Sequence, residues 1–155
     1  MGNCETRYEG KEKEMREIKF RGKRVDDGTW VYGGYHFEHG FGKHNEKHYI
    51  TYYGTFGSFC NNVFIQVISK TVGQFTGLKD KNGVEIYEGD VVKIVNNYNE
   101  ATKKTSDNVV VKFKDGSFIV TWDVGDDEHY NHFTSYNTPI VTFEVIGNIH
   151  DKEEK

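Results

Sequence analysis

Residues 109–122 read VVVKFKDGSFIVTW and contain the clearest secondary-structure signal in the chain. Apolar side chains recur in them at every second position, which is the spacing of residues on one face of a β-strand. Asp115-Gly116 divides the segment, and Asp-Gly is a dipeptide typical of tight hairpin turns. We therefore expect a β-hairpin. The side chains predicted to share one face of the hairpin are Val109, Val111, Phe113, Phe118, Val120 and Trp122.

The composition of the whole chain agrees with this hairpin. The 155 residues include 16 Val and 10 Ile but one Leu and one Ala, together with 23 aromatic residues. β-Branched and aromatic side chains favour strands, whereas Ala and Leu lead the helix scale. A helical bundle, a coiled coil and a doubly wound α/β fold are therefore not expected. The aromatic content of 15% also excludes wholesale disorder.

Short strand patterns alternate with turn signals along the rest of the chain, as in a sandwich or barrel. Residues 33–48 are rich in Gly and His and predict a loop or an irregular hairpin. We predict an all-β fold in which an N-terminal β region (residues 15–70) packs on a small SH3-like barrel (residues 71–151), after a flexible leader at residues 1–14. Two separate cores of this size would be marginal, so we expect the two parts to pack together or the protein to self-associate.

Charge and sorting signals indicate a soluble protein of the reducing cytoplasm. The net charge is −4, which provides no overall basic field for holding nucleic acid. No apolar run approaches the roughly 20 residues of a membrane-spanning helix, so no membrane partner is expected. The two cysteines do not form a disulfide framework, and the CxxC spacing of a zinc site is absent from the sequence.

Four segments resemble the YopX family of phage and prophage proteins. They are residues 15–23 (MREIKFRGK), 28–33 (GTWVYG), 71–92 (TVGQFTGLKDKNGVEIYEGDVV) and 143–151 (FEVIGNIHD). The resemblance implies a small, mostly β, phage-encoded protein in the cytoplasm of a bacterial host. The family is one of uncharacterised function, so the resemblance carries over no catalytic or ligand-binding residues.

The longest of these segments has a structural interpretation of its own. Asn82-Gly83 is predicted to supply positive φ at both centres of a tight turn. Gly89 permits a sharp approach to Asp90, whose side chain is expected to hydrogen-bond the backbone of the next strand. Ile86 and the residue after it should lie on opposite faces, one toward the barrel and one toward a neighbour.

Three groups of residues and one cysteine have side chains suited to chemistry, but none has the arrangement that a site requires. Four histidines have ligand chemistry but sit in a Gly-rich segment without a nearby Cys; they are His36, His39, His44 and His48. An acidic loop lacks the regular spacing of a calcium loop; it contains Asp123, Asp126, Asp127, Glu128, His129 and His132. Nothing in the sequence separates the pKa values of the carboxylates Glu85, Glu88 and Asp90, and Cys60 has no assignable base. We therefore predict no metal, no cofactor and no catalysis.

Basic and aromatic residues gather near the start of the patterned region. This candidate partner or nucleic-acid surface consists of Arg16, Lys19, Arg21, Lys23, Arg24, Trp30 and Tyr32. Small β-proteins bind single strands by stacking bases on rings beside basic side chains. The basic stripe is only partial here, because acidic residues are interspersed. We expect a non-catalytic module that binds a host or phage protein, with nucleic-acid binding by this hairpin as the alternative and an enzyme third.

Overall fold

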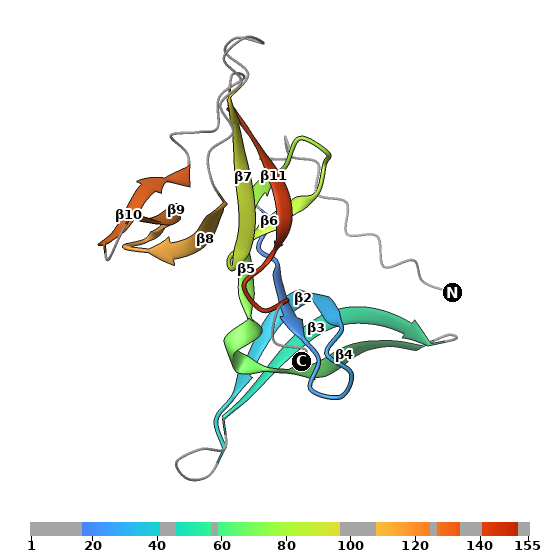
Figure 1. Ribbon diagram of the computed structural model, residues 1–155. Helices are drawn as coiled ribbons and strands as arrows, with labels where there is room; N and C mark the ends of the chain where they lie inside the picture. Colours follow the sequence, from blue (N-terminus) through green and yellow to red (C-terminus); the bar gives the residue numbers. More distant parts are fainter. Residues whose placement is uncertain are drawn as a thin grey trace.

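The protein consists of two antiparallel β-sheets, as Figure 1 shows for the computed structural model. The structure describes residues 17–40, 46–56, 59–96, 108–124, 127–133 and 141–151. The first sheet has the order β4-β3-β2-β1-β5-β6, and the second has the order β10-β9-β8-β7-β11. The strands of the first sheet are β1 (Phe20–Lys23), β2 (Trp30–Glu38), β3 (Lys47–Phe56), β4 (Phe59–Val67), β5 (Gly73–Lys79) and β6 (Glu85–Tyr87). Those of the second are β7 (Asp90–Asn96), β8 (Val109–Lys114), β9 (Ser117–Val124), β10 (Asp127–His132) and β11 (Val141–Asn148).

The predicted all-β class is confirmed, but the predicted SH3-like barrel is not. Within the described residues, β10 and β11 are the two edges of an open second sheet and do not pair with each other. The strands β5 and β6 join the first sheet, because β5 pairs with β1. These two strands also cover the inner face of the second sheet, so that face is buried without closure of a barrel. The first sheet thus contains strands from both sides of residue 70, and the domain boundary drawn there stays a prediction.

The main hydrophobic core lies between the second sheet and the β5–β6 strands. Ile86 of β6 is fully buried in this core, and Leu78 of β5 packs against it. The other buried members come from the second sheet and the segment after β10; they are Val92, Ile94, Val109, Val111, Val120, Phe133 and Phe143. The core is therefore made by residues of both sheets, which couples their folding.

The hairpin at residues 109–122 forms as expected, with a turn that fits its sequence. Asp115 has a φ of 50° and Gly116 a φ of 80°, so both central residues are left-handed, as a type I′ turn requires. Positive φ at both central residues was also expected at Asn82-Gly83, and there it is wrong. Only the glycine, Gly83, has positive φ in that turn.

Within residues 33–48, the hairpin alternative of the prediction is confirmed, but the pairing is regular: β2 continues through two glycines to Glu38 and pairs with β3 without a register shift. At Gly33 the strands approach so closely that an added Cβ atom would lie 2.1 Å from the carbonyl oxygen of Thr51. Glycine is thus needed inside the strand for close packing, and in this chain it does not end the strand.

The first sheet curls until its first and fourth strands meet. The Val25 amide donates to the carbonyl oxygen of Gln66 at 3.2 Å, and the Ile68 amide donates to that of Lys23 at 2.8 Å. One further antiparallel bridge links residues 24 and 67. The short 3₁₀ turn η1 (Ser69–Thr71) then leads from β4 into β5. The curl encloses Ile50, which is fully buried.

A second connection between the sheets is the turn between β5 and β6. The buried carboxylate of Asp80 accepts hydrogen bonds from the amides of Asn82 and Val84 within the turn. It also accepts one from the Val145 amide of β11 at 3.1 Å, and the Lys81 amide donates to β11 at 3.0 Å. The turn therefore covers the β11 edge.

We predict that Ile86→Ala lowers the free energy of unfolding by about 2–5 kcal/mol, since it leaves a cavity where the two sheets meet. The measurement is urea unfolding followed by tryptophan fluorescence. The control is Val84→Ala in the same turn region, where the side chain is exposed and the expected cost is below about 0.5 kcal/mol. Equal effects of the two variants would contradict the shared core.

Candidate functional site

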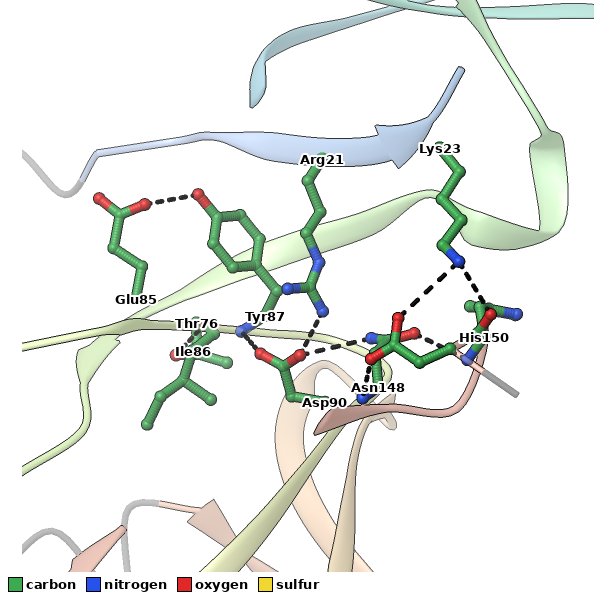
Figure 2. Close-up of polar contacts among 10 residues, drawn as sticks. Arg21, Lys23, Thr76, Glu85, Ile86, Tyr87, Asp90, Asn148 and His150 are labelled. Carbon is green, nitrogen blue, oxygen red and sulfur yellow. Dashed lines mark hydrogen bonds and ion pairs between the residues drawn. The ribbon is translucent and has the colours of Figure 1, made fainter. Parts of the chain in front are cut away.

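A buried polar cluster joins the two sheets where β6 turns into β7; we call it the junction (Figure 2). Arg21 of β1 reaches from the first sheet to Asp90 at the start of β7 and forms a salt bridge with it. These residues are 7% and 1% exposed, respectively. The other oxygen of Asp90 accepts the Tyr87 amide at 2.8 Å, and the side chain of Asn148 donates to Asp90 at 3.3 Å. Asp90 thus collects donors from three segments of the chain.

Aromatic rings enclose the guanidinium of Arg21. Its central carbon lies 4.6 Å from the ring centre of Trp30 and 4.7 Å from that of Tyr87. A desolvated guanidinium is stabilised over such rings by cation–π attraction, and a buried carboxylate completes the compensation of its charge. The positive charge is therefore compensated inside the protein, whereas the buried Nε atom of Arg21 has no hydrogen-bond partner among the described residues.

Lys23 connects the C-terminal end of β11 to the same cluster (Figure 2). Its ammonium donates to the carbonyl oxygen of His150 at 3.0 Å and lies 3.8 Å from Asp151. The ammonium is also 5.5 Å from the ring centre of Trp30. The two basic residues of β1 that point to this side thus both anchor the end of the β7–β11 pair at which Asp90 lies opposite Asn148.

The backbone at Gly89 shapes the corner that presents Asp90. Gly89 has a φ of 84°, and an added Cβ atom would lie 3.2 Å from the side-chain nitrogen of Asn148. Its amide donates to the carbonyl oxygen of Val111 at 2.8 Å, and its own carbonyl accepts from Ile149 at 3.0 Å. The expected role of Gly89 is confirmed. The expected bond from Asp90 to the next strand is wrong, because the carboxylate bonds the preceding strand at Tyr87.

At the far end of Tyr87, a second polar group forms (Figure 2). The Tyr87 hydroxyl donates to Glu85 at 2.6 Å, and the Lys19 ammonium donates to the same carboxylate at 2.7 Å. Lys19 first, and then the tyrosine hydroxyl, lower the pKa of Glu85 below its ordinary value. Burial and the neighbouring carboxylate raise the pKa of Tyr87, so its hydroxyl stays protonated and acts as a donor.

A pocket of about 250 Å³ lies beside the junction. Its walls come from η1, the β6–β7 corner, β8 and the end of the described chain; they are Lys70, Thr71, Val72, Glu88, Gly89, Val111, Lys112, Ile149 and His150. Burial raises the pKa of Glu88, and backbone hydrogen bonds at Phe113 and Gln74 partly offset this effect. Glu88 is the one carboxylate among these lining residues, so the pocket does not offer the paired carboxylates of acid–base hydrolysis.

The predicted basic and aromatic surface is largely turned inward. Arg21, Lys23 and Trp30 belong to the junction, and Tyr32 packs edge-on against the Tyr87 ring with 5.6 Å between the ring centres. Lys19 bonds Glu85, and the Arg24 guanidinium bonds Asp26 at 2.8 Å. Arg16 lies outside the described residues. Each described cation of this set therefore has an acidic partner in the same chain, and a binding role for the set stays a prediction.

The histidines of residues 36–48 do not converge. His36 packs against Tyr49 and Phe64, whereas His48 shares a 2.7 Å hydrogen bond with the Tyr35 hydroxyl and contacts Phe37. His44 lies outside the described residues, as do the side chains of Asp123 and residues 125–128. Across the part of the chain that the structure describes, no three His, Cys, Asp or Glu side chains group as metal ligands. In the same part, no helix is long and apolar enough to cross a membrane.

The sequence interpretation missed an exposed surface on β2, β3 and β4, which we call the aromatic face: His36, Tyr49, Tyr53 and Phe64. The strand register places these side chains on one side of the sheet. His36 lies directly opposite Tyr49. Tyr53 lies opposite the residue two positions before Phe64, and residues two positions apart on a strand point to the same side. Tyr53 is 72% exposed and Phe64 is 52% exposed. The even spacing of Tyr49 and Tyr53 in the sequence indicated that their rings share a side of the strand. The sequence did not indicate which strand pairs with this one, so Phe64 of β4 could not be assigned to the same surface.

Comparison with known proteins gives a family and a similar fold. Residues 19–155 match the family model described as YopX protein. The structure is similar to the crystal structure of protein EF1440 from Enterococcus faecalis, with a TM-score of 0.50 and 22% sequence identity. The match covers 90% of this chain and 98% of EF1440. At this identity the likeness concerns the fold. The search of curated proteins found no match.

We predict that Asp90→Asn costs about 3–5 kcal/mol of the free energy of unfolding, because it leaves Arg21 buried without a counter-charge. Urea unfolding provides the measurement. The matched control is Glu144→Gln, which removes a carboxylate from the exposed pair with Lys81 and should cost less than about 1 kcal/mol. If Asp90→Asn lowers the free energy of unfolding no more than Glu144→Gln does, the junction contributes little to stability.

We also predict a pH-dependent effect of Glu85→Gln. Because the folded-state pKa of Glu85 is lowered, its ionised form stabilises the fold fully above its ordinary pKa of 4.5, and this contribution disappears as the pH falls through the lowered value. At pH 7 the variant should therefore be about 1 kcal/mol less stable than the natural protein. Thermal unfolding at several pH values should show the difference shrinking toward acid, and a constant difference would argue against the Lys19–Glu85 pair as its source.

Proposed function

We propose that this chain, which belongs to the YopX protein family, is a non-catalytic binding module for a protein of a phage or of its bacterial host, acting in the host cytoplasm. Its binding surface in this proposal is the aromatic face of β2, β3 and β4. The junction has a different part: it fixes the first sheet to the second and so holds this face in a defined orientation.

The observation that carries the proposal is the uneven distribution of exposed rings. Seven Phe and Tyr side chains are exposed in the described residues, and five of them lie on β2, β3 and β4. The five are Tyr32, Tyr35, Tyr52, Tyr53 and Phe64; the other two are Phe113 and Tyr130. The two most exposed of the seven, Tyr53 and Phe64, lie on the aromatic face, whereas the register places Tyr35 and Tyr52 on the opposite side of the sheet. Large rigid rings supply contact area at a low entropic cost, and they are enriched at the centres of protein interfaces.

Charge on these strands supports a protein partner over a nucleic acid. Apart from histidines, β2, β3 and β4 contain only two charged residues, Glu38 and Lys47, which face each other at one end of their strands. Interface centres are depleted of charge, whereas binding to phosphate needs unpaired cations. The cations of β1 already have carboxylate partners, which lowers the charge available for a nucleic-acid backbone.

The aromatic face is tested by comparing proteins captured from phage-infected bacteria by the immobilised chain and by its Tyr53→Lys variant. The control is Tyr130→Lys, which changes another exposed tyrosine, on the second sheet. We expect a specific protein to be retained by the natural chain and the control, and to be lost with Tyr53→Lys. Retention by all three, or loss with the control alone, would contradict the assignment.

Fluorescence polarisation with labelled single-stranded and duplex oligonucleotides tests the alternative. At low ionic strength, where phosphate contacts are strongest, we expect no saturable binding. Saturable binding that falls with added salt and is lost in Lys19→Gln would favour the nucleic-acid interpretation of the β1–β2 hairpin.

A further inference from the structure

The outer side of β4 is a free strand edge over part of its length. Gln66 and Ile68 turn their backbone groups outward, where they bond residues 23–25. In an antiparallel strand, alternate residues point their amide and carbonyl groups to the same side. Asn62 and Phe64 must therefore also point their backbone groups away from β3. No described residue bonds these outward groups.

In the part of the chain that the structure describes, this edge lacks the usual protection against strand pairing. Natural edge strands are kept single by charges, proline, bulges, short length or a covering segment. Among the edges in the described residues, β6 has three residues, β10 begins with Asp-Glu, and β11 is covered by the turn at residues 80–81. By contrast, β4 has nine residues, FCNNVFIQV, with no charge and no proline.

We propose that two copies of the chain pair antiparallel through residues 61–65 of β4, about a two-fold axis at Val63. In this register the outward amide and carbonyl of Asn62 bond those of Phe64 of the partner subunit, and the reciprocal bonds form across the axis. The pairing ends at Ile65, because residues 23–25 cover the edge from Gln66 onward. The two first sheets become one continuous sheet.

The edge fits a second copy because it is compatible with itself. Across a two-fold axis, each side chain meets another from the same short segment, so a charge at the axis would face its own copy and a charge elsewhere would face one of the uncharged residues of the segment. The segment Asn61–Ile65 has none. Val63 would face its own copy on one side of the sheet, while the Phe64 rings would extend the aromatic face across both copies. The proposal goes beyond the proposed function and does not require it.

Analytical ultracentrifugation of the full chain over about a hundredfold range of concentration measures the pairing. We expect a reversible dimer of the 17.9 kDa chain. Asn62→Pro removes an outward amide without breaking the bonds to β3, and it should weaken dimerisation roughly tenfold or more. The matched control Asn62→Ala keeps the amide and should dimerise like the natural chain. Circular dichroism verifies that both variants are folded.

Disulfide trapping tests the register even if Asn62→Pro is poorly folded. With both natural cysteines replaced by Ser, Val63→Cys should cross-link to itself rapidly under mild oxidation, since residues at the axis form a close non-hydrogen-bonded pair. Asn61→Cys is the control, because its opposite residue is Ile65 of the partner subunit. A monomer at all concentrations, dimerisation unchanged in Asn62→Pro, or equal cross-linking at positions 61 and 63 would overturn the proposal.

Discussion

The salt bridge between Arg21 and Asp90 is the constraint that relates the two sheets of this protein. A guanidinium and a carboxylate buried together lose their hydration, and this loss is compensated only if further groups pair with them. Here the rings of Trp30 and Tyr87 enclose the cation, while the Tyr87 amide and the Asn148 side chain bond the anion. A shift of either sheet would leave a buried charge unpaired. The pair therefore makes one relative position of the sheets far more stable than others.

The longest family-like segment, residues 71–92, is explained by this arrangement. Asp80 orders the turn over β11, Ile86 enters the core, Tyr87 faces the opposite side and Asp90 receives Arg21. The segment thus acts as the connection between two sheets, with a structural use for its most distinctive residues. The binding surface that we propose is accordingly elsewhere, on the ring-rich strands β2, β3 and β4, whose charged residues apart from histidines are Glu38 and Lys47.

Much of the fold was predictable because strand patterns are local. Alternation at residues 109–122 and the scarcity of Leu and Ala indicated sheets, and Gly89 indicated a corner. The barrel was wrong because pairing of β5 with β1 joins segments about fifty residues apart, which no local pattern encodes. The basic residues of β1 were interpreted as surface because their partners are also distant in the sequence. The carboxylates that pair with Arg21 and Lys23 belong to residues 90 and 151. The aromatic face could not be predicted because it depends on the pairing of β4 with β3.

Native-state hydrogen exchange tests most directly whether the junction makes the two sheets one cooperative unit. The comparison is between the most protected amides of the first sheet, such as Ile50, and those of the second, such as Val111 and Val120. If the junction couples the sheets, both groups exchange with the same opening free energy, and Asp90→Asn lowers that value equally in both. If one sheet opens at a clearly lower free energy, or the substitution affects one sheet alone, the buried pair does not hold the molecule together.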